Sequence, residues 1–310
     1  MIRGRLAALA VALAGCGKPA RQAGPRGYDG AAPLAASADA ASDAASDAAS
    51  DAAPDAAPVA GADGAAGVPD ATTTDGSAVI PDATTRLITV VAADASTITA
   101  EATLWARDDG AAPWRALARW PVVLGRAGLA WGRGQHGAGA PAELLGAGAS
   151  GADKREGDGK SPAGVFALGR TFGYGAQAAA PGGLPHVALT AGWRCVDDPA
   201  SGRYNQVFDA SGVRIDWGSA EVMRRDDVLY QLGAEVAHNP GRAAGAGSCI
   251  FLHVWADATA PTAGCTAMAE PDLARLLAAL APAQHPRLVQ LTAADYAALA
   301  AAWRLPPSSR

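Results

Sequence analysis

A cysteine and a histidine in the last fifth of the chain have the residue types and the spacing that nucleophilic catalysis needs. Cys265 sits in a loop of small residues, 261–266, and His253 ends an apolar run twelve residues earlier. A thiol becomes a good nucleophile when a nearby imidazole takes its proton. Gly264 lets the backbone turn sharply, so that the N–H groups of Gly264 and Cys265 can point at a developing oxyanion. These residue types therefore favour a nucleophilic site, with Cys265 as nucleophile, His253 as base and Gly264 beside the oxyanion.

The same residue types allow other interpretations on spacing alone. Cys249, His253 and Cys265 could be three ligands of a zinc ion, although no fourth ligand has a suitable spacing. Cys265 could also be half of a disulfide. A cysteine peptidase of papain-like design usually has its cysteine before its histidine, whereas His253 precedes Cys265 here.

The elements that must position this pair are mainly strands. Runs rich in β-branched residues or alternating in polarity predict strands at 87–91, 97–106, 114–120, 121–125, 187–190, 213–217, 248–255 and 288–291. Two helices are predicted near the C-terminus. One opens at Glu270 with a proline next to it, and the other spans 293–304 with Thr292 as its cap. We expect one mainly β (α+β) domain over residues 86–310.

Three ordered motifs make the prediction more specific. The first is the segment 154–166, which contains Gly-Asp-Gly-Lys-Ser-Pro, and the second is 193–199, followed by Tyr204-Asn205. The third is His253 with Thr262-Ala263-Gly264-Cys265. Together they resemble the L,D-transpeptidase catalytic (YkuD-like) family in its lipoprotein form, within a divergent exported branch. The resemblance covers residues 86–291.

The resemblance implies a β-sandwich or barrel with small C-terminal helices, and a two-step acyl transfer on peptidoglycan. Cys265 would attack the diaminopimelate carbonyl of a stem peptide, and His253 would move the proton. An amine, or water, would then accept the acyl group, with no cofactor and no metal. The chain departs from the commoner family form: Ala263 replaces a second histidine, and residues 266–268 lack the usual arginine.

Further residues are predicted to lie around this pair. The substrate-binding candidates are Thr262, Asp198, Tyr204, Asn205, Tyr230 and Asn239. A Cys195–Cys249 disulfide could brace the site. His238 could contact substrate or lie in an exposed loop.

The N-terminus predicts export and lipidation. Arg3 and Arg5 precede an apolar run, 6–14, that is too short to span a bilayer. The run ends in Leu-Ala-Gly-Cys, which resembles a bacterial lipobox. We therefore expect a signal peptide over residues 1–15, and a lipidated Cys16 that anchors the chain in a membrane. Gly17 after the cysteine favours the outer membrane, with the protein facing the periplasm.

Residues 16–85 form the predicted tether that follows the lipidated cysteine. From residue 20 onward the segment consists mostly of Ala, Asp, Ser, Pro and Gly, and it holds ten Asp against Arg21 and Arg26. Such a segment buries too little apolar surface to offset its ordering entropy, so we expect it to be disordered. The remaining chain is close to neutral and gives no electrostatic reason to expect nucleic acid as a partner.

Two functions of different classes follow from the sequence. The first is a peptidoglycan L,D-transpeptidase, or a close relative with carboxypeptidase or amidase activity. The second is a non-catalytic lipoprotein that binds peptidoglycan and ties the outer membrane to the wall. The partners in both cases are peptidoglycan stem peptides and the membrane.

Overall fold

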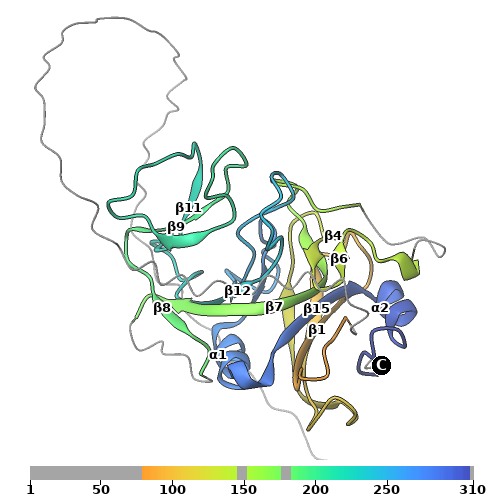
Figure 1. Cartoon of the computed structure of the whole chain (residues 1–310). Helices are drawn as coiled ribbons and strands as arrows, with labels where there is room; N and C mark the ends of the chain where they lie inside the picture. Colours follow the sequence, from red (N-terminus) through yellow and green to blue (C-terminus); the bar gives the residue numbers. More distant parts are fainter. Residues whose placement is uncertain (1–78, 145–151, 176–182, 308–310) are drawn as a thin grey trace, which may run out of the picture. The chain divides into compact units, whose positions relative to one another are not determined.

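A computed structural model describes residues 79–144, 152–175 and 183–307 of this chain (Figure 1). The predicted signal peptide, Cys16 and the tether as far as residue 78 lie outside the described residues. Within the described ranges, no helix is long and apolar enough to cross a membrane. Ile80 and Thr84, which precede the predicted domain start at Arg86, are buried.

The predicted mainly β class is confirmed. The larger sheet of the described residues has ten strands. They are β1 (Arg86–Ala92), β2 (Thr99–Ala106), β3 (Arg115–Val123), β4 (Leu129–Trp131), β7 (Ser161–Gly173), β8 (His186–Ala188), β12 (Leu232–Val236), β13 (Phe251–Val254), β14 (Thr266–Met268) and β15 (Arg287–Thr292).

This sheet closes on itself like a barrel. The pairing runs from β12 through β13, β14, β3, β2, β1 and β15 to β7, and β7 pairs again with β12. β1 and β15, from opposite ends of the described chain, lie side by side as a parallel pair (Figure 1). Barrel closure leaves few exposed strand edges. Within the barrel, β13 and β14 pair with each other although a loop separates them in sequence.

Buried apolar runs explain why these strands form. Leu87, Ile88 and Val90 of β1 are buried, as are Val165 and Phe166 of the long strand β7. Both faces of such strands are covered, which produces continuous apolar stretches rather than strict alternation. Large side chains from segments that are distant in sequence fill the hydrophobic core.

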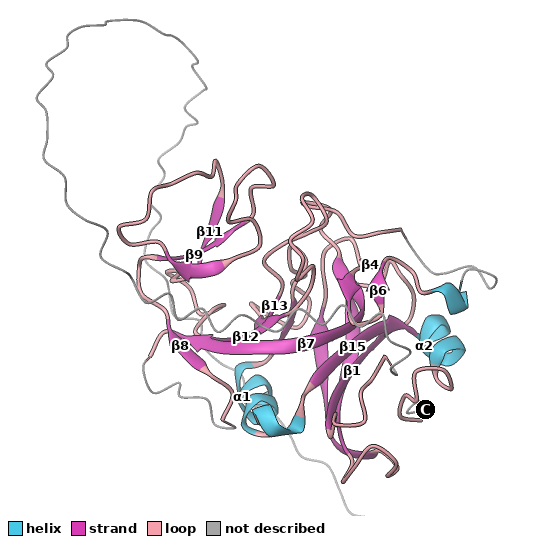
Figure 2. Ribbon diagram, in the orientation of Figure 1, coloured by secondary structure: helices cyan, strands magenta, loops and turns pink. Residues whose placement is uncertain are grey.

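The two predicted helices are present, with small differences. α1 (Glu270–Ala278) buries Leu273, Leu276 and Leu277, as its apolar face predicts. α2 (Ala293–Leu299) begins at Thr292, whose side-chain oxygen accepts a hydrogen bond from the Asp295 N–H at 3.1 Å. The prediction that this helix runs to 304 is wrong: residues 300–304 form turns that bury Trp303. Figure 2 shows both helices at the periphery of the larger sheet.

A three-stranded sheet lies to one side of the larger sheet (Figure 2). It consists of β9 (Trp193–Val196), β10 (Val207–Asp209) and β11 (Ala220–Val222). The strand predicted at 213–217 is wrong, since these residues form an irregular loop between β10 and β11. Ile215 is 67% exposed there, and the Asp216 carboxylate accepts hydrogen bonds from the loop at 201–202 instead of facing a core.

The short elements complete the fold. They are β5 (Arg133–Gly134), β6 (Gly137–Ala138), and the 3-10 turns η1 (Ala142–Leu144) and η2 (Pro282–Gln284).

Two predicted strands, 114–120 and 121–125, are one strand, β3, because Pro121 is accommodated opposite Glu101. The strand predicted over 248–255 is only β13, since Cys249 has a φ of +55°, which a strand cannot adopt.

Candidate active site

The structure places the predicted nucleophile and base in one cavity. A cavity of about 450 Å³ is lined by Cys265, His253, Gly264, Thr262 and Tyr230, together with residues of neighbouring loops. This volume is in the range of small-molecule sites. Of the nine residues predicted for catalysis and substrate binding, these five meet at the cavity.

Strand pairing explains how the pair is brought together. β13 and β14 are parallel neighbours, with Leu252 opposite Thr266 and His253 opposite Ala267. Cys265 immediately precedes β14, so the loop that leaves His253 returns the cysteine beside the same strand. The backbone N–H of Phe251, on β13, donates to the Cys265 Sγ at 3.3 Å. Among the described residues, no hydrogen bond joins the Cys265 and His253 side chains directly.

The nucleophile loop is held by hydroxyl groups. The Cys265 carbonyl accepts from Thr262 Oγ1 at 2.6 Å and from Ser161 Oγ at 2.9 Å. Ser161 also accepts from the Gly125 N–H, so it connects three segments that are distant in sequence. The predicted role of Thr262 is therefore partly structural: it fixes the turn that presents Cys265.

One bond modifies the predicted oxyanion site. The Gly264 N–H already donates to Thr262 Oγ1 at 3.1 Å. It can stabilise an oxyanion only by exchanging that bond for a bond to the substrate. Gly264 also lies tight against the turn at Lys160, because a Cβ at this position would lie 3.1 Å from the Lys160 carbonyl oxygen. A larger residue would push the loop away from this turn.

Burial controls the protonation of the Cys265 thiol. The side chain is 7% exposed, and its thiol donates to the Cys249 carbonyl at 3.4 Å. Burial, reinforced by the negative charge of Glu221, raises the pKa of the thiol to about 12. The Phe251 N–H opposes this by stabilising the thiolate. In the absence of substrate, the sulfur is therefore protonated at neutral pH.

His253 is neutral for the same reason. Burial lowers the pKa of its imidazole to about 4, although the carbonyl groups of Val254 and Leu229 favour the protonated form. Nδ1 lies 2.8 Å from the Val254 carbonyl oxygen, which can only accept, so Nδ1 carries the hydrogen. Nε2 then keeps its lone pair and can accept a proton. The resting state is a neutral thiol and a neutral imidazole in the same cavity.

Tyr230 and Glu221 form a second pair at the cavity. The Tyr230 hydroxyl donates to Glu221 Oε1 at 2.6 Å, and its ring packs edge-on against His253 with the ring centroids 5.2 Å apart. Burial raises the pKa of both groups above their usual values. Sequence reasoning proposed Tyr230 but missed Glu221, because a glutamate in a short strand carries no motif.

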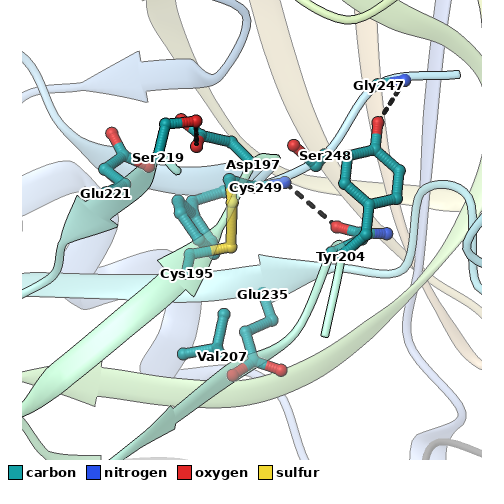
Figure 3. The surroundings of a disulfide bond; sticks show 12 residues. Cys195, Asp197, Tyr204, Val207, Ser219, Glu221, Glu235, Gly247, Ser248 and Cys249 are labelled. Carbon is teal, nitrogen blue, oxygen red and sulfur yellow. Dashed lines mark hydrogen bonds between the residues drawn. A yellow bond between two sulfur atoms is a disulfide. The ribbon is translucent and has the colours of Figure 1, made fainter. Parts of the chain in front are cut away.

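The predicted disulfide is present. Cys195 of β9 and Cys249 are bonded, and this links the three-stranded sheet to the segment before β13 (Figure 3). Cys265 is the free cysteine of the described residues. The alternative in which Cys249, His253 and Cys265 bind zinc is wrong, since the Cys249 sulfur is committed to the disulfide. The described residues hold no group of three or more potential ligands placed to bind a metal.

Four predicted substrate-binding residues do not line this cavity. Tyr204, Asn205 and Asn239 instead form hydrogen bonds to main-chain groups or to other side chains. Asp198 lies in an exposed turn and accepts from the Ala200 and Gly218 N–H groups. The structure therefore assigns these four residues to support of the fold around the site, and not to the cavity wall.

The asparagines form a connected set, here called the asparagine cluster: Asn205, Asn239 and the backbone of 238–249. Asn205 donates to the carbonyl groups of His238 and Asn239, and accepts from the Cys249 N–H at 3.0 Å. Asn239 donates to the carbonyl groups of Ala243 and Gly247. Both have positive φ angles, +58° and +51°, which asparagine tolerates better than most residues. The cluster fixes the backbone that presents Cys249 to Cys265.

Tyr204 and His238 are also supporting residues. The Tyr204 hydroxyl donates to Glu156 and accepts from the Gly247 N–H at 3.1 Å (Figure 3). His238 is 2% exposed, so neither predicted role for it holds. Its Nε2 donates to the Ala246 carbonyl and its Nδ1 accepts from the Arg133 N–H.

Sequence reasoning missed Arg126 and Glu156 as cavity residues. Arg126 lies three residues after the end of β3 and belongs to none of the three motifs. Glu156 lies inside the first motif, three residues before Gly159, and that position is the signal that could have found it.

Three kinds of comparison with known proteins return nothing for this chain: no family model, no curated protein and no solved structure matches it.

Proposed function

We propose that this chain is a cysteine acyltransferase of the L,D-transpeptidase type that acts on peptidoglycan stem peptides. The observation that carries the proposal is the neutral imidazole of His253 in the same cavity as the Cys265 thiol, with its Nδ1–H on a carbonyl. This leaves a basic nitrogen for the thiol proton. The three sequence motifs that meet around the cavity support the choice of substrate.

The proposed first step forms a thioester. The Cys265 sulfur attacks the carbonyl of the diaminopimelate residue as His253 Nε2 takes the thiol proton. The amide bond to the terminal D-alanine breaks, and the proton passes from His253 to the leaving amine. In the second step an amine attacks the thioester and regenerates the thiol; with water as acceptor the product is a free acid.

The raised pKa of the thiol favours a second candidate, a peptidoglycan-binding lipoprotein without turnover. A buried, protonated sulfur is a weak nucleophile until substrate and base change its surroundings. In both candidates lipidated Cys16 would hold the chain at the outer membrane facing the periplasm, with peptidoglycan as the partner.

One experiment separates the two. The full-length chain and a Cys265→Ala variant are incubated with tetrapeptide muropeptides and with sacculi, and the products are identified by mass spectrometry. The variant is checked for the Cys195–Cys249 disulfide and for its melting temperature. Loss of D-alanine that requires Cys265 supports the acyltransferase. Absence of turnover, with both proteins sedimenting with sacculi, would favour the binding protein.

A further inference from the structure

Three cations line the cavity, and they differ in their partners. Lys154 Nζ lies 2.6 Å from a carboxylate oxygen of Asp158, and Arg225 lies 2.7 Å from Asp227. These two charges are neutralised within the protein. Arg126 forms no ion pair with any residue in the described ranges.

The acids of the cavity do not serve Arg126 either. Each is engaged by hydroxyl groups: Glu156 by Tyr204 and Ser248, Asp197 by Ser219, and Glu221 by Tyr230. Among the described residues, Arg126 is thus the one cavity cation that is paired with no carboxylate of those same residues. A cation in this situation favours an anionic group of a ligand.

The backbone places Arg126 next to the nucleophile loop. Its N–H donates to the Thr262 carbonyl at 2.9 Å, and the Thr262 N–H donates to the Leu124 carbonyl. These two hydrogen bonds join the backbone around Arg126 to Thr262, which lies three residues before Cys265. They therefore fix the position of the Arg126 backbone relative to the nucleophile loop.

Gly159 shapes the path of the side chain. A Cβ at Gly159 would lie 3.0 Å from Cγ, Nε and Cζ of Arg126, so the arginine runs along the bare face of this glycine. Gly159 has a φ of +69°, which other residues rarely adopt. The turn of the first motif therefore supports the guanidinium on one side and leaves its other side open.

From this arrangement we infer that Arg126 is a substrate-positioning residue that binds a free carboxylate of the acyl-donor peptide beside Cys265. A guanidinium matches a carboxylate with two parallel hydrogen bonds, which fixes orientation as well as charge. The inference rests on the proposed function. Two of the free carboxylates of a stem peptide belong to the residues on either side of the bond that breaks, one to the terminal D-alanine and one to diaminopimelate.

The test compares three donors on the full-length chain: the tetrapeptide with both carboxylates free, the same peptide with a C-terminal amide, and the same peptide with the diaminopimelate carboxylate amidated. The proteins are wild type, Arg126→Gln, and Arg119→Gln as a matched control. Arg119 is a surface arginine of β3 paired weakly with Glu101, and it does not line the cavity.

We expect Arg126→Gln to raise KM for the free donor about tenfold, the loss expected of one charged hydrogen-bonding pair, with kcat changed less than about threefold. The amidated donor that wild type uses less well than the free donor identifies the carboxylate that Arg126 binds. Arg126→Gln should use this amidated donor and the free donor equally well. Arg119→Gln should behave as wild type. An unchanged preference in Arg126→Gln would overturn the inference while leaving the proposed function standing.

A second readout needs no turnover. Alkylation of Cys265 by iodoacetate, an anion, and by iodoacetamide, which is neutral, is followed by mass spectrometry of the Cys265 peptide. Arg126→Gln should lower the ratio of the iodoacetate rate to the iodoacetamide rate by about threefold or more, since the positive charge that concentrates the anion is removed. If wild type shows no turnover, the proposed function fails, and an unchanged alkylation ratio then refutes anion binding at Arg126 as well.

Discussion

The cavity around Cys265 and the asparagine cluster behind it both bury polar side chains, but they use them differently. In the asparagine cluster, Asn205 and Asn239 give their donors to main-chain carbonyl groups. In the cavity, His253 uses one ring nitrogen on a carbonyl and keeps the lone pair of the other. A buried polar group with only main-chain partners shapes the backbone, whereas one that keeps a reactive atom next to open volume can do chemistry.

Two histidine variants test this contrast most strongly. His253→Asn retains a donor for the Val254 carbonyl but removes the base, so kcat/KM should fall about 10²–10⁴-fold with little change in stability. His238→Asn should do the reverse, because His238 does not line the cavity and its loss disturbs two main-chain bonds, at a cost of about 2 kcal/mol of unfolding free energy. Kinetics and urea unfolding of both variants provide the check. Equal loss of activity in the two would erase the distinction.

Loss of the Cys195–Cys249 disulfide should have a nearly equally large effect, and this effect is on stability. It closes a loop with a sequence separation of 54 residues. A Cys195→Ser, Cys249→Ser double variant should lose about 4 kcal/mol of unfolding free energy, from the larger freedom of its unfolded chain. Denaturant unfolding with and without reductant measures this. Reduced wild type should match the double variant, and a stable reduced protein would contradict the prediction.

Asn205 should show a moderate effect. Asn205→Gly keeps the positive φ accessible and removes only the side-chain bonds, so we expect a loss of about 2–3 kcal/mol from unpaired main-chain groups. Asn205→Ala should lose about 1 kcal/mol more because of its φ of +58°. Thermal unfolding of the pair separates these two causes. A more stable alanine variant would refute the assignment.

The smallest expected effect is a flat pH profile. The reactive form has a protonated thiol and a neutral imidazole, and the pKa values of about 12 for Cys265 and about 4 for His253 make this form dominant in between. Protonation of His253 lowers the rate as pH falls through about 4, and not through the usual 6.5. Between pH 5.5 and 8, kcat/KM should change less than about twofold. Half-loss near pH 6.5 would place His253 in contact with water.

Stability must be followed in the same buffers. Since the folded pKa of His253 lies below the usual 6.5, the unfolded chain binds the proton first as pH falls from about 6.5 to about 4. The stability that the buried neutral ring contributes is complete above pH 6.5 and decreases over that window. Rates should therefore be compared only where circular dichroism shows folded protein.

The sequence predicted the parts of the fold that depend on local pattern. Alternating or β-branched runs located β1, β2 and β15, and the proline next to Glu270 located the start of α1. The same rules failed at residues 213–217, where Ile215 in the middle of an alternating run faces solvent, and at residues 248–250, where the positive φ of Cys249 interrupts the strand. Neither local conformation nor exposure can be obtained from the spacing of apolar residues.

For the site, the motifs brought out Cys265 and His253, and tertiary structure decided the rest. Asn205 and Tyr204 follow the second motif, and they support the disulfide segment instead of facing the cavity. Arg126 and Glu221 belong to no sequence motif, and tertiary structure alone places them at the cavity. For Arg126, this placement depends on hydrogen bonds to the nucleophile loop, which lies more than 100 residues later in the chain.

The Ser161 hydroxyl, which bonds Gly125 and Cys265, has a consequence for folding. The bond to Cys265 spans 104 residues, and β14, the strand that follows the cysteine, pairs with β3 from the first third of the described chain. Contacts of such sequence separation form slowly, because the entropy of closing the intervening loop must be overcome first. Until these late contacts form, Cys265 and His253 are not held in one cavity, and the site is assembled only when the last strands have closed the barrel.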